Sequence, residues 1–405
     1  MELIEIPKDE LFLGMSLEYT LRDAAGLVLL TKANKIETQQ QLDAIRSRQR
    51  IYVDIDQTVG RVRAVMSSLS ALDHAGAPIK DFARFLNQKK VSQTDEKQTD
   101  NLAQRWGDVE SNLGGLLASV ETADDFANRI AMLERGIRQL LNEDANASQF
   151  FLFNRAVTHF GGYSVMHSLL CATLVSSLAE VFALTDTQRS SLVCAALTMN
   201  VAMTRLQDML AVQKQAPSPG QRSLIDTHAA AGRKMLEQAG VADQTWLMVV
   251  AMHHATITGP DDVSSWPAVK RMTKILQTAD RYTAAMSPRK SRAGRTARDS
   301  VRTVVIHAGD TRHDEVGTAL VKLLGLSPPG TFVKLANAET AVVMRRGIRP
   351  AEPWVASVLN RHDEPIAEPR LRDTSKADFA VQSTLTATSV RVNLNIELML
   401  RLIPK

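Results

Sequence analysis

Apolar residues recur at helical spacing through the middle of the chain and alternate with polar residues near its ends. Between residues 151 and 307 the helical period predicts an all-helical domain with short connections. Pro217-Ser218-Pro219-Gly220 interrupts this period and predicts a new helix start directly after it. The helices that we expect here are His167–Phe182, Asp186–Met199, Gln221–Gln238, Asp243–His254 and Ala268–Met286.

The alternating segments on either side predict strands. The first 60 residues combine three strand-like segments with a polar amphipathic helix at Thr38–Ser47 and a turn at residues 23–26; the strands are Leu3–Ile6, Gly26–Thr31 and Arg50–Val53. Beyond residue 325 we expect a β-hairpin around Asn337 and two further strands: Thr331–Leu335 paired with Thr340–Arg346, then Trp354–Leu359 and Val390–Leu394.

These patterns together predict a mainly α protein in four parts. We expect a small α+β module at residues 1–60, a helical spacer at 61–147, a helical domain at 148–324 and a β-rich tail at 325–405. Residues 89–101 nearly lack large apolar side chains, so we expect a solvated linker there.

Composition narrows the class of protein. The 405 residues are 44% hydrophobic and 23% charged, which is typical of a globular protein. A net charge of +4 is too small to predict DNA binding, although it suits a small anionic ligand. The N-terminus lacks a signal-peptide pattern and the apolar runs are too short to cross a bilayer, so we expect a cytoplasmic location and no membrane span. Cys171 and Cys194 lie in apolar helical segments and predict buried structural thiols.

Four histidines and an aspartate are the candidate chemistry of the helical domain: His167, His228, the adjacent pair His253 and His254, and Asp280. Each has an ordinary explanation, because core histidines are often simply hydrogen-bonded and Asp280 could form an ion pair with a neighbouring arginine. Two adjacent histidines at an expected helix end point more strongly to a ligand site.

In their order and spacing these positions resemble the HD-GYP family, a branch of the HD metal phosphohydrolases that cleave cyclic di-GMP. The resemblance covers about residues 148–308, with a family-like tail at 323–373. It implies an HD-type helical domain with a C-terminal β-hairpin extension, and it implies that the five residues are metal ligands. In that family two divalent ions are bridged by a carboxylate and by the hydroxide that attacks phosphorus.

The chain departs from the family at that chemistry. Met199 and Asn200 stand where the family has an adjacent His–Asp pair, and Met203 stands where it has a lysine. Tyr163 takes a position that in some members is a carboxylate ligand, and the signature loop is replaced at residues 255–262. A thioether and a neutral amide replace neither an imidazole nor a bridging carboxylate, so a binuclear centre is not expected.

Features that would bind a ligand are better preserved. Arg289 and Arg292 match arginines that follow the last aspartate in the family, and Lys290, Arg295, Arg298 and Arg302 extend the basic stretch. Guanidinium groups suit phosphate oxygens and the O6/N7 edge of guanine. The alternative is a solvated basic helix face.

The sequence therefore predicts a bacterial cyclic di-GMP signalling protein with a degenerate HD-GYP domain, and it leaves open whether the chain is an enzyme. We expect it to bind cyclic di-GMP, another phosphate-bearing small molecule or a partner protein, with one divalent iron, manganese or zinc ion or with none. One alternative is a metal-dependent phosphohydrolase that uses a reduced metal site. Another is a non-enzymatic interaction scaffold that resembles the HD-related output domains.

Overall fold

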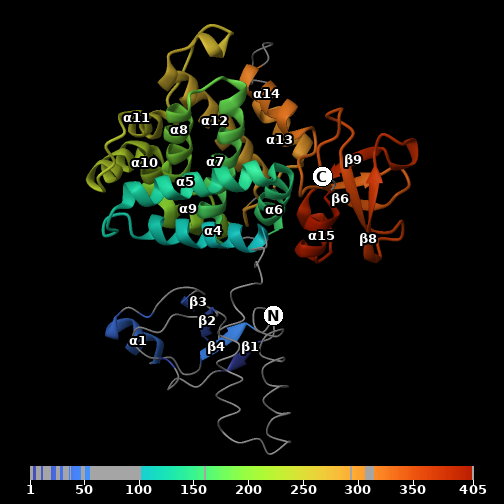
Figure 1. Cartoon of the computed structure of the whole chain (residues 1–405), viewed down its shortest axis with the longest axis horizontal. Helices are drawn as coiled ribbons and strands as arrows, with labels where there is room; N and C mark the ends of the chain where they lie inside the picture. Colours follow the sequence, from blue (N-terminus) through green and yellow to red (C-terminus); the bar gives the residue numbers. More distant parts are fainter. Residues whose placement is uncertain are drawn as a thin grey trace, which may run out of the picture. The chain divides into compact units, whose positions relative to one another are not determined.

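The computed structural model describes residues 102–158, 161–291, 294–305 and 314–403, together with parts of 3–54 (Figure 1). The chain divides into two compact units, Met1–Thr99 and Asp100–Lys405. The predicted linker at 89–101 lies outside the described residues, as do residues 24–26 of the turn predicted at 23–26.

The first unit is a small α+β module, as predicted. Its four strands form an antiparallel sheet in the order β1-β4-β2-β3: β1 (Leu3–Glu5), β2 (Leu21–Asp23), β3 (Val28–Leu30) and β4 (Ile51–Asp54). Helix α1 (Gln39–Arg46) contributes Leu42 and Ile45, which are both buried. They pack in one apolar cluster with Leu21 of β2 and Ile51 of β4, so the amphipathic pattern of α1 reflects its packing on the sheet.

Helices α4 (Leu102–Ala118), α5 (Phe126–Glu143) and α6 (Ala145–Thr158) begin the second unit. Their buried side chains, including Trp106, Ile130 and Phe153, belong to the same hydrophobic core as the helices that follow. The predicted boundary at residue 147 therefore falls inside α6, one of several helices that share one core.

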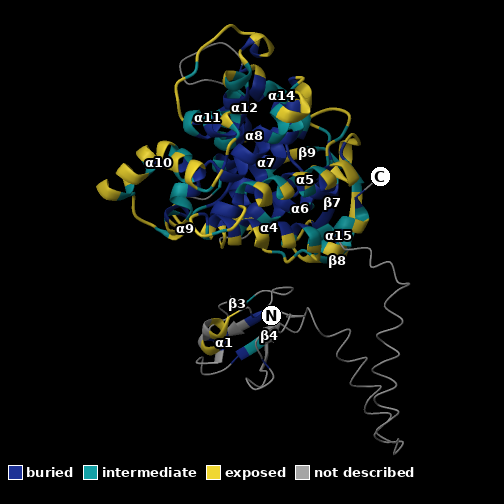
Figure 2. Cartoon of the chain, turned by 60° about the vertical axis from the view of Figure 1, so that its left-hand side comes forward, coloured by how far each residue is buried: buried dark blue, intermediate teal, exposed yellow. Residues whose placement is uncertain are grey.

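Helix α7 (Tyr163–Val181) lies at the centre of this unit, where Figure 2 shows buried residues on all its sides. Among the described helices it alone is long and apolar enough to cross a membrane, but 83% of its apolar window is buried. A helix that is hydrophobic all round and covered by other helices is typical of a protein core. This burial agrees with the expectation of no membrane span.

Four further helices follow the predicted segments closely: α8 (Asp186–Thr198), α10 (Pro219–Gln238), α11 (Gln244–Met252) and α12 (Ala268–Met286). The structure adds elements that were not predicted individually: η4 (Val201–Met203), α9 (Thr204–Val212), η5 (Val263–Ser265), α13 (Ala297–Val305) and α14 (Glu315–Leu324). Helix α10 begins where the proline-rich break predicts a start, and Ser218 and Gln221 form a reciprocal capping box there. The mainly α fold class is confirmed.

Polar contacts fix helix α11 against helix α8. The carboxylate of Asp243 caps the N-terminus of α11 by accepting from the backbone N–H groups of Thr245 and Trp246, and it also accepts from the hydroxyl of Ser191. The indole Nε1 of Trp246 donates to the Thr198 hydroxyl at 2.7 Å. Since α11 has only nine residues, these contacts set where its C-terminal end lies.

The C-terminal tail is an antiparallel sheet in the order β8-β7-β6-β5-β9, followed by helix α15 (Ile396–Leu402). Its strands are β5 (Phe332–Leu335), β6 (Thr340–Arg345), β7 (Trp354–Leu359), β8 (Pro365–Asp373) and β9 (Val381–Leu385). The predicted hairpin and the strand at Trp354–Leu359 are confirmed. The predicted strand at Val390–Leu394 is wrong, because this segment is irregular and its half-buried apolar side chains pack beside Met399 of α15.

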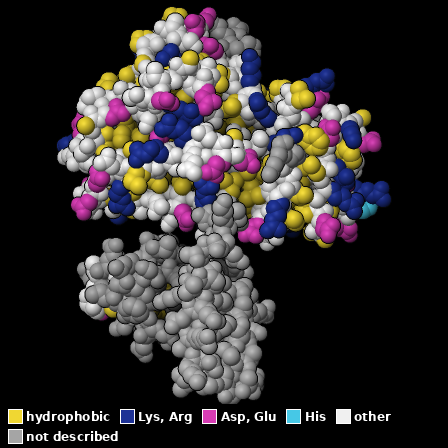
Figure 3. All heavy atoms as spheres, viewed as in Figure 1, with side chains coloured by type: hydrophobic (Ala, Val, Ile, Leu, Met, Phe, Trp, Pro, Cys, Tyr) yellow, Lys and Arg dark blue, Asp and Glu magenta, His cyan; other side chains and the backbone are white. Residues whose placement is uncertain are grey.

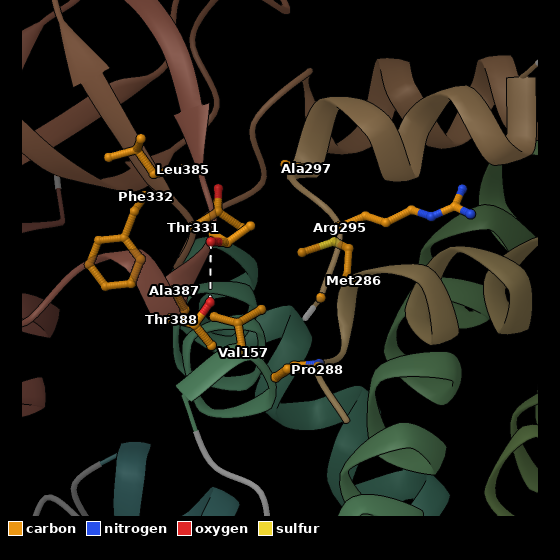
Figure 4. Close-up of a pocket in the computed structure, with 12 residues that line it drawn as sticks. Val157, Met286, Pro288, Arg295, Ala297, Thr331, Phe332, Leu385, Ala387 and Thr388 are labelled. Atoms are coloured by element: carbon orange, nitrogen blue, oxygen red, sulfur yellow. Dashed lines mark hydrogen bonds between the residues drawn. The ribbon is translucent and has the colours of Figure 1, made fainter. Parts of the chain in front are cut away.

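Gly330 joins the sheet to α6. It has φ +83°, and a Cβ there would lie 2.5 Å from the backbone nitrogen of Asn154. Its N–H donates to the Val343 carbonyl at 2.7 Å, and its carbonyl accepts from the Asn154 side chain at 3.2 Å. A cavity of about 20 Å³ lies beside this junction, and Figure 4 shows the Arg295 side chain pointing away from it.

Candidate metal centre

The structure brings the five histidine and aspartate positions together from four helices of the second unit. His167 lies on α7, His228 on α10 and Asp280 on α12, while His253 and His254 follow the end of α11. The ligand atoms form two groups, and within each group they lie within 4.8 Å of one another: His228, His253 and His254; and His167, Cys171 and Asp280. His253, His254 and Asp280 line the same cavity, which connects the two groups.

The first group is defined by the hydrogen bonds of His228 and His253. Nδ1 of His228 is bonded to the Ile225 carbonyl, and Nδ1 of His253 to the Val250 carbonyl at 2.6 Å. A carbonyl only accepts, so each Nδ1 carries the ring's hydrogen and each Nε2 of a neutral ring presents a lone pair. These Nε2 atoms lie 3.0 Å apart in a buried environment.

Protonation does not relieve this contact at neutral pH. Burial is the main cause that lowers the pKa of His253 to about 4, and the neighbouring His254 lowers it further. Burial also lowers the pKa of His228. The two neutral rings thus bring two acceptor nitrogens within 3.0 Å of each other, an arrangement that a shared cation would relieve.

A divalent metal ion fits this donor set. Two imidazole nitrogens on one transition-metal ion lie about 2.9–3.4 Å apart, given metal–nitrogen bonds of about 2.0–2.1 Å and angles of about 90–109°. A ligating histidine also commonly donates its other ring N–H to a carbonyl, as His228 and His253 do. The exposed His254 completes the group, with its ring centroid 4.1 Å from that of His253.

The second group is a buried hydrogen-bonded cluster. Nε2 of His167 lies 2.8 Å from Oδ1 of Asp280 and 3.7 Å from Sγ of Cys171. Burial lowers the pKa of His167, but Cys171 and the hydrogen bond with Asp280 outweigh it, so the net pKa lies well above its usual range. Burial raises the pKa of Asp280, yet His167 brings it down to about 2. As they stand here, the two side chains form an imidazolium–carboxylate pair.

Met199, Asn200 and Met203, which depart from the family, belong to neither group of ligand atoms. The Met199 side chain is fully buried in the hydrophobic core at the end of α8. Asn200 is 5% exposed, and its backbone carbonyl accepts from the N–H of Met203 at 2.9 Å. Met203 lines a separate cavity of about 530 Å³ together with Val120, Leu206, Leu224 and Met235.

A cavity of about 290 Å³ opens beside the histidines. Its wall includes His253, His254 and Asp280, together with Lys274, Gln277 and Arg281 of α12. Lys274 forms an ion pair with the buried Asp314, and Arg281 lies 3.7 Å from the same carboxylate. The sequence interpretation did not identify these two cations as part of the site, although it considered a neighbouring arginine as an ion-pair partner of Asp280. Their spacing on α12 is a signal that could have found them, because Lys274, Gln277 and Arg281 are three and four residues apart and so share one helix face.

Arg289, a predicted ligand-binding residue, contacts Tyr163. Nε and Nη2 of Arg289 donate to the Tyr163 hydroxyl at 3.2 and 2.8 Å. The Tyr163 ring stacks on His167, with centroids 5.8 Å apart and an interplanar angle of 12°. Arg289 therefore connects to the second group through Tyr163. Arg292 lies outside the described residues.

Basic side chains are spread over the visible surface of the second unit. Figure 3 shows lysines and arginines interspersed with acidic residues on that face.

No protein-family model and no curated protein match the sequence. Among solved structures, the chain is similar to Bd1817, a HDG"Y"P protein from Bdellovibrio bacteriovorus, with a TM-score of 0.46 and 12% sequence identity. The matched region covers 80% of this chain and 99% of that chain.

Proposed function

We propose that this chain is a bacterial, cytoplasmic signalling protein whose helical unit is a degenerate HD-GYP-type receptor. It binds a divalent metal ion and a phosphate-bearing small molecule, with cyclic di-GMP as the first candidate, and does not hydrolyse it efficiently. The observation that supports metal binding is the 3.0 Å contact between the unprotonated Nε2 atoms of His228 and His253. Met199 and Asn200, which stand in place of the His–Asp pair, support the loss of efficient hydrolysis.

The metal would be held by His228, His253 and His254. Imidazole nitrogens are borderline ligands that suit iron, manganese or zinc. When bound, such an ion supplies a fixed positive charge that attracts a phosphate oxygen. The protein's own contribution is to hold the two buried rings in one tautomer through the carbonyls of Ile225 and Val250.

Loss of the bridging carboxylate argues against efficient hydrolysis. Two neighbouring cations repel each other unless an anion is shared between them, and the attacking hydroxide depends on that pair. The amide of Asn200 carries no charge, and the thioether of Met199 is directed into the apolar core. A single ion can still bind phosphate without presenting a well-placed nucleophile.

The shape and charge of the adjacent cavity suit a phosphate group. A volume of about 290 Å³ lies at the lower end for small-molecule sites, so it would hold the phosphate-bearing part of a nucleotide. Lys274 and Arg281 on its wall are both charged, and Arg281 is 38% exposed. Their common partner Asp314 is fully buried, so a phosphate group in the cavity would approach them from the other side.

Calorimetry with cyclic di-GMP tests this proposal when it is carried out on metal-loaded and on chelator-treated protein. We expect binding that is stronger with metal, and a chromatographic assay of the same samples should show intact nucleotide. An exposed histidine far along the chain, His362, offers the matched control: His362→Ala should bind as the unmodified protein does, and His253→Ala should not. Absence of binding in every sample would refute the receptor and favour an interaction scaffold.

A second candidate is a phosphohydrolase with a reduced metal site. It is favoured by the opening of His253, His254 and Asp280 into a cavity that a substrate phosphate can enter. Metal-dependent turnover of cyclic di-GMP or another phosphoester that disappears in His253→Ala would support this candidate over the receptor.

A further inference from the structure

Cys171 and His167 lie one helical turn apart on α7 and face the same carboxylate. Sγ of Cys171 is 3.7 Å from Nε2 of His167, which in turn is 2.8 Å from Oδ1 of Asp280. All three ligand atoms lie within 4.8 Å of one another. The thiol is free and its side chain is 0% exposed. A structural thiol needs only apolar neighbours, whereas this one lies beside an imidazole and a carboxylate.

These distances approach those of a tetrahedral zinc site. With Zn–S of about 2.3 Å, Zn–N of about 2.05 Å and Zn–O of about 2.1 Å, sulfur and nitrogen ligands lie about 3.6 Å apart, and nitrogen and oxygen about 3.4 Å. The sulfur–nitrogen distance here is 3.7 Å. The nitrogen–oxygen distance is that of a hydrogen bond, 2.8 Å, so the Asp280 carboxylate would move by about half an ångström on metal binding.

We propose that His167, Cys171 and Asp280 form a zinc-binding site in which the Cys171 thiolate supplies a ligand that the lost His–Asp pair does not. This group is separate from the three histidines of the proposed function, so the inference depends neither on an ion there nor on nucleotide binding. On coordination the thiol and the imidazole release their protons to solvent.

Charge balance favours a divalent ion at this group. A thiolate and a carboxylate together neutralise the ion, so no unpaired charge is left in a buried environment, where it would be costly. The soft sulfur also selects zinc over manganese or magnesium. With Cys171 as a ligand, the group of His167, Cys171 and Asp280 would therefore prefer zinc.

The fourth position and the route to it lie on the cavity side. Cys171 and His167 are almost inaccessible, but the Asp280 side chain is 18% exposed and lines the 290 Å³ cavity. A water molecule or a ligand phosphate can approach the ion from that side. Three protein ligands with an open fourth position is the arrangement typical of catalytic and ligand-binding zinc sites.

The two cysteines provide a matched test. Cys194 is also buried, lies on the neighbouring helix α8 and has a pKa that burial raises to about 12. We expect cobalt-loaded protein to show a near-ultraviolet thiolate-to-cobalt charge-transfer band. The band should persist in Cys194→Ser and disappear in Cys171→Ser, whose zinc affinity should fall at least about 10-fold.

X-ray absorption at the zinc edge of the unmodified protein does not depend on the folding of any variant. We expect a sulfur shell at about 2.3 Å, and a spectrum with nitrogen and oxygen shells alone would overturn the inference. Calorimetry with cyclic di-GMP on the same zinc-loaded sample separates the two proposals. A sulfur shell without nucleotide binding would refute the receptor and keep the zinc site, whereas binding without sulfur would do the reverse.

Discussion

Nε2 of His228 lies 3.0 Å from Nε2 of His253, while Nδ1 of each ring is hydrogen-bonded to the carbonyl three residues earlier. The carbonyls determine the tautomer, and the tautomer leaves two lone pairs facing each other. A metal ion converts this repulsive contact into two bonds. The contact thus links the local geometry of a histidine within α10 and a histidine at the end of α11 to the binding of a cation.

Removal of one of these rings should abolish metal binding at the first group. We expect His253→Ala to lower the affinity for manganese, iron or zinc by at least about 100-fold, because a direct ligand is lost where even supporting groups contribute about 10–100-fold. Elemental analysis after loading and gel filtration measures the effect. Equal metal content in His253→Ala and in the exposed-site control His362→Ala would contradict this prediction.

A His–Asp pair introduced at positions 199 and 200 should restore metal binding and hydrolysis. We expect the double variant Met199→His with Asn200→Asp to bind additional metal and to hydrolyse cyclic di-GMP at least about 10-fold faster than the unmodified chain, because it regains a ligand and a bridging carboxylate. The buried imidazole at position 199 should lower the free energy of unfolding by about 1–3 kcal/mol. The single variants are the controls, and unchanged metal stoichiometry in the double variant would be the contrary result.

The spacing of apolar residues predicts helices and strands that bury one face or all of their faces. It does not predict strands that are mostly exposed and are held only by pairing with another strand. Helix α7 and strand β7 were expected because their apolar runs are continuous. Strand β8 has mostly exposed residues and pairs only with β7, so its sequence lacks alternation. Apolar and polar residues alternate at 390–394, but the predicted strand is absent because the apolar side chains there pack beside α15 without strand pairing.

The sequence predicts the site residues whose side chains commonly bind metal and occur in the order of a known family. Histidine order identified His228 and His253, but Cys171 was interpreted as a core residue, although its spacing of four from His167 places both on one helix face. The bond from Arg289 to Tyr163 spans 126 positions, and no local pattern contains that information.

Gly330 should be intolerant of any side chain. We expect Gly330→Ala to lower the free energy of unfolding by at least about 2 kcal/mol, since it combines a left-handed backbone with overlap against α6. Gly136→Ala is the matched control, because nothing lies within 4 Å of a Cβ there and alanine should stabilise helix α5 by about 0.5–1 kcal/mol. Chemical denaturation compares the two, and similar effects would show that the junction at Gly330 is not tightly packed.

The tail sheet should lose stability in acid through Glu339. Burial raises the pKa of Glu339, but the hydrogen bonds from Arg372, at 3.1 Å, and from Ser357 outweigh it and lower the net value. A carboxyl whose folded pKa is depressed contributes stability above its unfolded pKa of about 4.3, and loses that contribution as the pH falls through the folded value. Melting temperatures measured between about pH 6 and about pH 3 should therefore fall less steeply for Glu339→Gln than for the unmodified protein.

The Glu339→Gln variant should be less stable at neutral pH, because the amide keeps the shape and loses the charge that faces Arg372. Parallel melting curves across this range would show that the pair with Arg372 contributes no pH-dependent stability.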